Sequence, residues 1–205
     1  MKHFSRATIE LLETRYRNNL INSISGYKSA NLIGSISSEG KTNLAIFNSV
    51  VHLGSHPALL GFILRPTTVP RHSFENMLAT RFFTVNHVCK DHIADAHHTS
   101  AKYPEGISEF DHTHLNSVYK NAFPAPFVEN APVQIACRYV NNYHIKENDT
   151  RLVVAAVEHL YVNHAMLLDD GWVQLDKGDV VTINGLDGYA LPELIDRFPY
   201  ARPKK

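Results

Sequence analysis

Apolar and polar positions in the first half of the chain follow the pattern of short β-strands. Strand-like stretches cover residues 31–37, 43–53, 58–64 and 81–88. The stretch 58–64 is continuously apolar, which favours a strand buried on both faces. Turn signals at residues 38–41 and at His56-Pro57 separate the first three stretches, so we expect these to form an antiparallel meander.

The second half predicts a long hairpin. Residues 133–145 and 152–163 have strand character, and residues 146–149 form the turn between them. Val173 and residues 180–183 add short strands.

Helical patterns are few. Residues 8–22 predict an N-terminal helix laid on the body of the protein. Residues 73–80 predict a second helix, with His72 or Ser73 as its N-cap. Its apolar face carries Phe74, Met77 and Leu78.

These elements indicate one mainly β domain over residues 1–205. Residues 1–25 form an N-terminal helical extension, and the polar, His- and Pro-rich residues 89–130 form an excursion of short helices and loops. The expected six or seven strands fit a β-barrel with a few short helices, which leaves no exposed sheet edge. The chain has no Gly-x-Gly-x-x-Gly and no alternation of long helices with parallel strands, so a Rossmann sheet is excluded.

Charge and composition narrow the partners. The chain has 20 Lys and Arg against 20 Asp and Glu, so its formal net charge is zero and gives no bulk reason to expect nucleic acid or an acidic membrane. No stretch approaches the roughly 18 apolar residues that span a bilayer. Two cysteines, Cys89 and Cys137, fit a reducing compartment, and the first residues lack an apolar signal segment. We therefore expect a cytoplasmic protein.

Residues 42–49 are a candidate binding strand for a planar ring. Such a ring needs hydrogen bonds along its edge and an apolar surface against its face. Asn43, Asn48 and Ser49 supply the first, and Leu44 and Ala45 contribute to the second. The alternative is a half-buried strand whose polar side chains are solvated.

Residues 65–73 are a candidate phosphate site. Arg65, Thr67, Arg71, His72 and Ser73 fall in one loop that leads into the predicted helix. Charge-assisted donors and the free N–H groups of a helix start suit a phosphate. An ordinary basic surface loop remains the alternative.

Other chemistry lacks a signal. His87, Cys89 and His92 lie close in sequence, but their spacing matches no zinc motif, and we expect no metal site. Gly-x-Ser-x-Gly is absent, and no residue stands out as a catalytic acid or base.

The order of motifs over residues 29–86 resembles the flavin reductase-like, FMN-binding split-barrel family. The family's Ala-Asn-Leu-Ile-Gly strand corresponds to residues 30–34, its Thr-Asn-Leu-Ala-Pro-Phe-Ser-Ser segment to residues 42–49, and its Asn-Pro-Pro-Leu-Val-Gly-Phe segment to residues 56–62. An Arg-Pro loop at Arg65 and a Glu-Phe-Val-Val-Asn-like strand at residues 82–86 follow in the same order.

The resemblance implies a fold, a cofactor and partners. It implies an FMN-binding split barrel that forms a homodimer, with FMN near the subunit interface. Family reductases pass hydride from NAD(P)H to flavin, and an oxygenase partner can take the reduced flavin. Two sets of residues would bind FMN: Asn43, Leu44, Ala45, Ile46, Asn48 and Ser49 along the ring, and Arg65, Thr67, Arg71, His72 and Ser73 at the phosphate.

Three departures from the family pattern keep alternatives open. Ile46 replaces a Pro, and Asn48 replaces a Ser. The turn at residues 148–150 reads Asn-Asp-Thr, where many reductases carry Gly-Asp-His, and His144 is out of register. An FMN-binding protein without reductase turnover and an FMN-dependent oxidase or oxygenase of unknown small-molecule substrate therefore stand beside the reductase. A structural or protein-binding barrel is a fourth reading.

Overall fold

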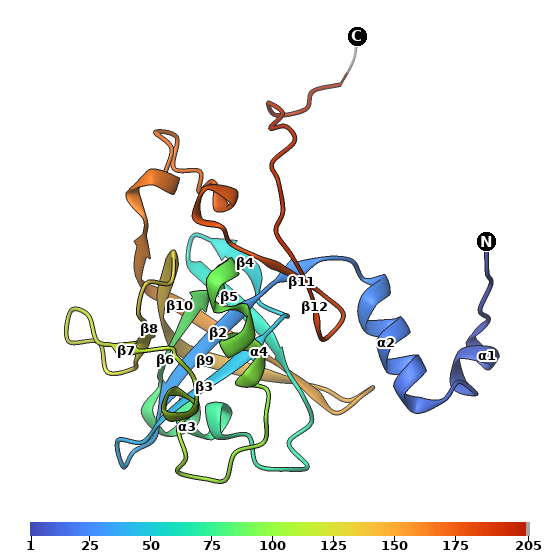
Figure 1. The fold of residues 1–205 in the computed structure, drawn as a ribbon, viewed down its shortest axis with the longest axis horizontal. Helices are drawn as coiled ribbons and strands as arrows, with labels where there is room; N and C mark the ends of the chain where they lie inside the picture. Colours follow the sequence, from blue (N-terminus) through green and yellow to red (C-terminus); the bar gives the residue numbers. More distant parts are fainter. Residues whose placement is uncertain (204–205) are drawn as a thin grey trace.

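The computed structural model describes residues 1–203, and its main body is a seven-stranded antiparallel sheet curled into a split barrel (Figure 1). The strand order is β3-β2-β6-β9-β10-β5-β4. The bounds are β2 Asn31–Ile36, β3 Thr42–Phe47, β4 Val51–Ser55, β5 Ala58–Leu64, β6 Phe82–His87, β9 Val133–Ile145 and β10 Thr150–Val162. The prediction of a mainly β barrel is confirmed.

Smaller elements surround this sheet. Two short sheets contain β1 Lys28–Ser29, β11 Thr182–Asn184 and β12 Gly188–Ala190 in one, and β7 Ser117–Val118 and β8 Phe127–Val128 in the other. The α-helices are α1 Arg6–Glu10, α2 Thr14–Ile24, α3 His72–Thr80 and α4 Ile93–His98. Single 3₁₀ turns cover Lys90–His92, Glu109–His112, His164–Met166 and Leu175–Gly178.

The barrel interior is filled by aromatic and branched side chains from alternate strand positions. Phe62 of β5 lies at the centre, edge-on to Phe47 at 5.1 Å and to Phe83 at 5.8 Å between ring centroids. Edge-to-face contacts of this kind stabilise aromatic pairs beyond the area they bury. Ile33 and Val85 complete this core on neighbouring strands.

The predicted meander of residues 31–37, 43–53 and 58–64 is wrong in its second connection, because residues 43–53 are not one strand. Residues 43–53 form two strands, β3 and β4, which lie at opposite edges of the sheet, so β3 does not pair with β5. Side chains end the strand: Asn48 donates to the Gly185 carbonyl at 2.9 Å, and the Ser49 hydroxyl bonds both the N–H and the carbonyl of Ile63. These bonds replace ladder hydrogen bonds and turn the chain from one edge to the other.

Helix α3 begins one residue before the predicted position. Its N-cap is Arg71, whose side chain makes no cap hydrogen bond, so the prediction of His72 or Ser73 as cap is wrong. The Arg71 N–H instead donates to the Glu75 carboxylate at 3.1 Å, and the Ser73 hydroxyl accepts from Asn43 of β3.

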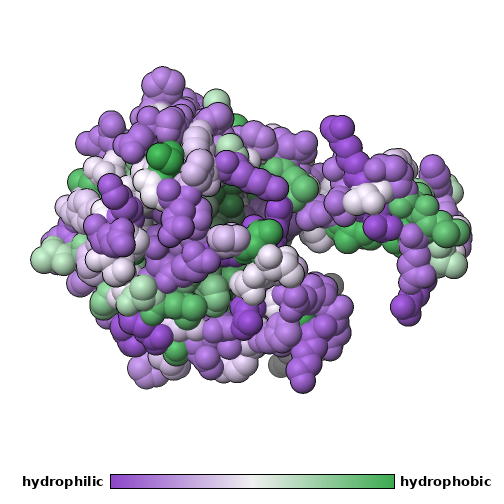
Figure 2. All heavy atoms as spheres, turned by 90° about the horizontal axis from the view of Figure 1, so that it is seen from below, coloured by the Kyte–Doolittle hydropathy of each residue, from purple (hydrophilic) through white to green (hydrophobic). Residues whose placement is uncertain are grey.

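The N-terminal segment is an arm, which corrects the prediction of a single helix laid on the body. Helices α1 and α2 project away from the barrel, and neither has a buried residue (Figure 1). Figure 2 shows hydrophobic residues gathered on this arm, and Leu11 and Ile24 are 86% and 68% exposed. Their apolar side chains therefore have little contact with the rest of the chain. None of the helices within residues 1–203 is long and apolar enough to cross a membrane.

Candidate functional site

The two segments singled out in the sequence lie against each other. Asn43 Nδ2 of β3 donates to Ser73 Oγ of α3 at 2.9 Å, and both side chains are buried. At the other end of β3, Ser49 is bonded to Ile63, close to Arg65 where β5 gives way to the loop. Residues 43–49 are thus bonded to the residues that lie before and after the loop 65–71.

The outer edge of β3 offers backbone groups to a ligand. Leu44 is fully buried, and its N–H points away from β2 and donates to the Glu109 carboxylate at 2.7 Å. Alternate residues of an antiparallel edge strand point their N–H and carbonyl groups in the same direction. The backbone groups of Ile46, which is half-buried, therefore face outward from the sheet.

Leu44 itself presents no free donor, since Glu109 takes its N–H. Glu109 is a buried carboxylate that the sequence reasoning did not select as a site residue. Burial raises the pKa of Glu109, and the hydrogen bond from Leu44 opposes part of that effect. Glu109 thus holds β3 in place from outside the sheet.

Asn48 and Ser49 hold the chain rather than standing free. The Asn48 amide is bonded to Gly185, and the Ser49 hydroxyl is bonded to β5. Their side chains are half-buried where β3 crosses to β4. A ring bound here would meet backbone groups more than these polar side chains, because their hydrogen-bonding groups are already used.

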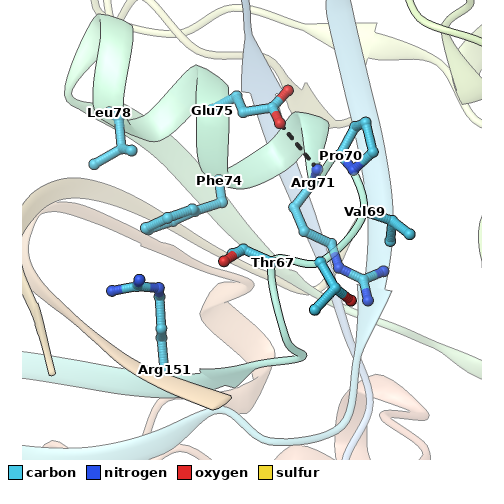
Figure 3. Close-up of a pocket in the computed structure, with 9 residues that line it drawn as sticks. Thr67, Val69, Pro70, Arg71, Phe74, Glu75, Leu78 and Arg151 are labelled. Carbon is cyan, nitrogen blue, oxygen red and sulfur yellow. Dashed lines mark hydrogen bonds between the residues drawn. The ribbon is translucent and has the colours of Figure 1, made fainter. Parts of the chain in front are cut away.

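Two hollows flank the start of α3. The larger, about 360 Å³, is lined by the loop, one face of α3 and the start of β10 (Figure 3). The smaller, about 230 Å³, lies toward β3. The residues of the larger are Thr67, Thr68, Val69, Pro70, Arg71, Phe74, Glu75, Leu78 and Arg151.

The predicted phosphate residues divide between these hollows. Thr67 and Arg71 line the larger one, whereas His72 lines the smaller one together with Asn43. Ser73 is buried against Asn43. Arg65 is exposed and lines neither hollow. The structure therefore gathers the set around one helix start but not into a single cavity.

Arg151 is a cation that sequence reasoning missed. It pairs with Leu64 across β10 and β5, which places it beside the point where the loop leaves the sheet. Its guanidinium is held by Asn142 Oδ1 at 2.8 Å. No local motif marks it, because the pairing joins residues far apart in the chain.

The hairpin at residues 146–149 also fixes His144. His144 Nε2 lies 2.6 Å from Asp149 Oδ1, and His144 is the cross-strand partner of Arg151. The histidine that is out of register in the sequence is therefore bonded within the hairpin tip.

The histidines near β6 do not converge. Within residues 1–203 no three His, Cys, Asp or Glu side chains are grouped so that they could hold a metal ion. Burial lowers the pKa of His87 to about 4, and its Nδ1 has no hydrogen-bond partner. Burial raises the pKa of the Cys89 thiol, but the hydrogen bond and charge of His92 lower it on balance.

The family follows from comparison with known proteins. Residues 27–173 match the model of the flavin reductase like domain. A crystal structure assigned as a flavin reductase with split barrel domain, from Shewanella frigidimarina NCIMB 400, is 43% identical, with a TM-score of 0.95 over 98% of this chain and 100% of that one. The chain belongs to the flavin reductase-like split-barrel family, a family of flavin-binding proteins, as the sequence resemblance implied.

More distant structures share the fold. Nitrilotriacetate monooxygenase component B from Bacillus cereus is 16% identical, with a TM-score of 0.82 over 98% of each chain. An FMN-binding protein from Thermus thermophilus is 14% identical, with a TM-score of 0.71 over 86% of this chain and 93% of that one. No curated protein matches the chain.

Proposed function

We propose that the protein is an FMN-dependent oxidoreductase of the flavin reductase type, which transfers hydride from NAD(P)H to flavin. The observation that carries this proposal is the hydrogen bond from Asn43 of β3 to Ser73 at the start of α3, because it joins a strand with an outward edge at Ile46 to the helix start that a cationic loop and hollow adjoin. A flavin mononucleotide needs both features, a hydrogen-bonding edge for its ring and donors for its phosphate.

The ring would lie along the exit of β3. The backbone of Ile46 would meet its edge, and Ala45, Asn48 and Ser49 would surround it. Asn43 and Leu44 would act by fixing the strand, through Ser73 and Glu109.

The phosphate would lie at the loop. Thr67 and Arg71 supply a hydroxyl and a guanidinium in the larger hollow, and the start of α3 at His72 and Ser73 supplies N–H groups. Arg65, which lines neither hollow, would add positive charge from its exposed position after β5. The FMN-binding protein from Thermus thermophilus, which has the same fold, supports FMN as the flavin.

The flavin supplies the hydride-accepting chemistry when it is bound. The chain's own part is to hold the ring edge and phosphate and to leave one ring face accessible to the nicotinamide. No side chain at the site is assigned as an acid or base.

A second candidate is an FMN-binding protein without reductase turnover. The hairpin observation favours it, because the tip has Asn148-Asp149-Thr150 and its nearby His144 is bonded to Asp149. An FMN-dependent oxidase or oxygenase acting on a small molecule would use the same flavin site.

The assembly we propose is a homodimer that works in the cytoplasm, with an oxygenase as the acceptor of reduced flavin. The projecting arm, with its exposed Leu11 and Ile24, supports a second copy as its partner, since an isolated helix of this length is marginal in water. Two free thiols support a reducing compartment. The monooxygenase component with the same fold supports an oxygenase partner.

Anaerobic titration tests the reductase. The protein loaded with FMN should lose the visible absorbance of oxidised flavin when NADH or NADPH is added. If both donors leave that band unchanged while FMN stays bound, the binding protein replaces the reductase.

A further inference from the structure

We propose that Arg151 and Arg71 together form a phosphomonoester-binding site in the larger hollow, with Arg151 as its anchor on β10. The inference rests on the proposed function, because the ester would belong either to the 5′-phosphate of FMN or to the 2′-phosphate of NADPH. It adds a residue from outside both segments selected in the sequence.

Both arginines line the hollow, and their guanidinium groups lie on opposite sides of it in Figure 3. The Arg151 side chain rises from β10 toward Phe74 and Thr67, and Arg71 lines the hollow from the loop (Figure 3). The volume of about 360 Å³ is ample for a phosphate and part of the group that carries it. Thr67 and Thr68 add two hydroxyl groups to the lining.

Arg151 is held in position by a chain of contacts. Its Nη1 donates to Asn142 Oδ1 at 2.8 Å, and the Asn142 amide donates to the Tyr139 hydroxyl. The ring of Tyr139 packs edge-on to Phe74 at 6.5 Å between centroids. One support therefore orients both the cation and the apolar floor of the hollow, which reduces the entropy that ligand binding would cost.

Neither guanidinium is neutralised by the protein. Within residues 1–203 no carboxylate forms an ion pair with Arg71 or Arg151. Their partners are neutral acceptors: Arg71 Nε donates to the Pro66 carbonyl at 3.1 Å, and Arg151 donates to an amide. Each guanidinium has more N–H groups than these bonds use, so donors remain for an anion.

The lining selects a phosphomonoester over other anions. A terminal phosphate carries close to two negative charges and accepts paired hydrogen bonds from guanidinium groups. Glu75, the one carboxylate in the lining, accepts a hydrogen bond from the Arg71 N–H. Phe74 and Leu78 offer apolar surface to the group that bears the phosphate.

Binding of four ligands tests the proposal. Dissociation constants of FMN, riboflavin, NADP⁺ and NAD⁺ are measured for the wild type, Arg151→Gln and Arg151→Lys. Arg151→Gln should weaken one phosphomonoester by about 10- to 100-fold, with the phosphate-free counterpart changed by less than about twofold. Arg151→Lys should recover part of the loss because it keeps the charge. Arg138→Gln, which removes an arginine paired with Glu158 elsewhere on the hairpin strands, is the matched control and should change neither ratio.

The pattern identifies the source of the phosphate. A selective loss of FMN over riboflavin assigns the hollow to the flavin phosphate, and a selective loss of NADP⁺ over NAD⁺ assigns it to the donor. Unchanged FMN-to-riboflavin and NADP⁺-to-NAD⁺ ratios in Arg151→Gln would overturn the site, even where the flavin itself binds well. If the wild type binds neither flavin, the proposed function fails, and the NADP⁺ and NAD⁺ pair alone decides whether the hollow binds a phosphomonoester.

Discussion

Asn43 Nδ2 donates to Ser73 Oγ at 2.9 Å, and this buried hydrogen bond joins β3, the proposed ring-binding strand, to the helix that follows the proposed phosphate loop. The two residues come from segments that the sequence marks for different parts of one ligand. Their contact fixes the position of the two segments relative to each other in the absence of a ligand.

Ser73→Ala tests this joint. The change leaves the buried Asn43 amide without its acceptor, which should cost about 1–3 kcal/mol of unfolding free energy. Urea unfolding followed by circular dichroism measures it. Ser38→Ala, on the exposed turn between β2 and β3, is the control and should stay within about 0.5 kcal/mol of the wild type. Equal stabilities of the two variants would contradict the role of the joint.

Glu109→Gln should change how stability depends on pH. Burial raises the pKa of Glu109 in the folded state, so its contribution to stability is present at pH values below the usual carboxyl pKa and is lost as pH rises through the raised value. Gln mimics the protonated form and can still accept from the Leu44 N–H. The free energy of unfolding should therefore be measured at pH 4 and pH 7 for both proteins. Relative to the wild type, the variant should be more stable at pH 7 than it is at pH 4. A constant difference between the two proteins would rule out the raised pKa.

His87 should destabilise the fold in mild acid. Its folded pKa of about 4 lies below the ordinary value of 6.5, so between these values only the unfolded chain takes up the proton. The wild type should lose up to about 3 kcal/mol as pH falls through this window. His87→Gln should lack that part of the loss, whereas His52→Gln, at an exposed position of β4, should keep it. If His87→Gln lost as much unfolding free energy as the wild type when the pH falls through this window, burial would not suppress protonation of His87.

The two thiols should react at very different rates. Cys137 is completely buried, and burial raises its pKa, whereas Cys89 is half-buried with a lowered pKa that depends on His92. Iodoacetamide should modify Cys89 in the folded protein and Cys137 only after unfolding, as mass spectrometry of the labelled peptides would show. His92→Gln should slow labelling of Cys89. Equal labelling of both cysteines in the folded state would be incompatible with the structure.

Local patterns in the sequence predicted the strands well. The continuously apolar run 58–64 is β5 at the predicted bounds, and residues 133–145 are β9. Hydrophobic periodicity and turn residues depend on a few neighbouring positions, so they indicate where each strand begins and ends. Local patterns do not set the order of strands in the sheet. Residues 43–53 have the pattern of one strand, because the division into β3 and β4 depends on hydrogen bonds from the Asn48 and Ser49 side chains to residues distant in sequence.

The candidate site was predictable to the same extent. The order of motifs indicated the loop and β3, and the structure places them together through Asn43 and Ser73. Arg151 and Glu109 were out of reach, because their positions depend on the pairing of β10 with β5 and on a 3₁₀ turn packed against β3. Contacts between residues distant in sequence leave no periodic trace.

The affinity for FMN compared with riboflavin, in the wild type and in Arg71→Ala, tests the central claim most directly. Arg71 lines the hollow and leaves part of its guanidinium for a phosphate. Equilibrium titration followed by flavin fluorescence should give tight FMN binding to the wild type. Arg71→Ala should lose about 1.5–3 kcal/mol of binding free energy for FMN and little for riboflavin. Failure of the wild type to bind FMN, or an equal loss of both flavins in the variant, would contradict the account.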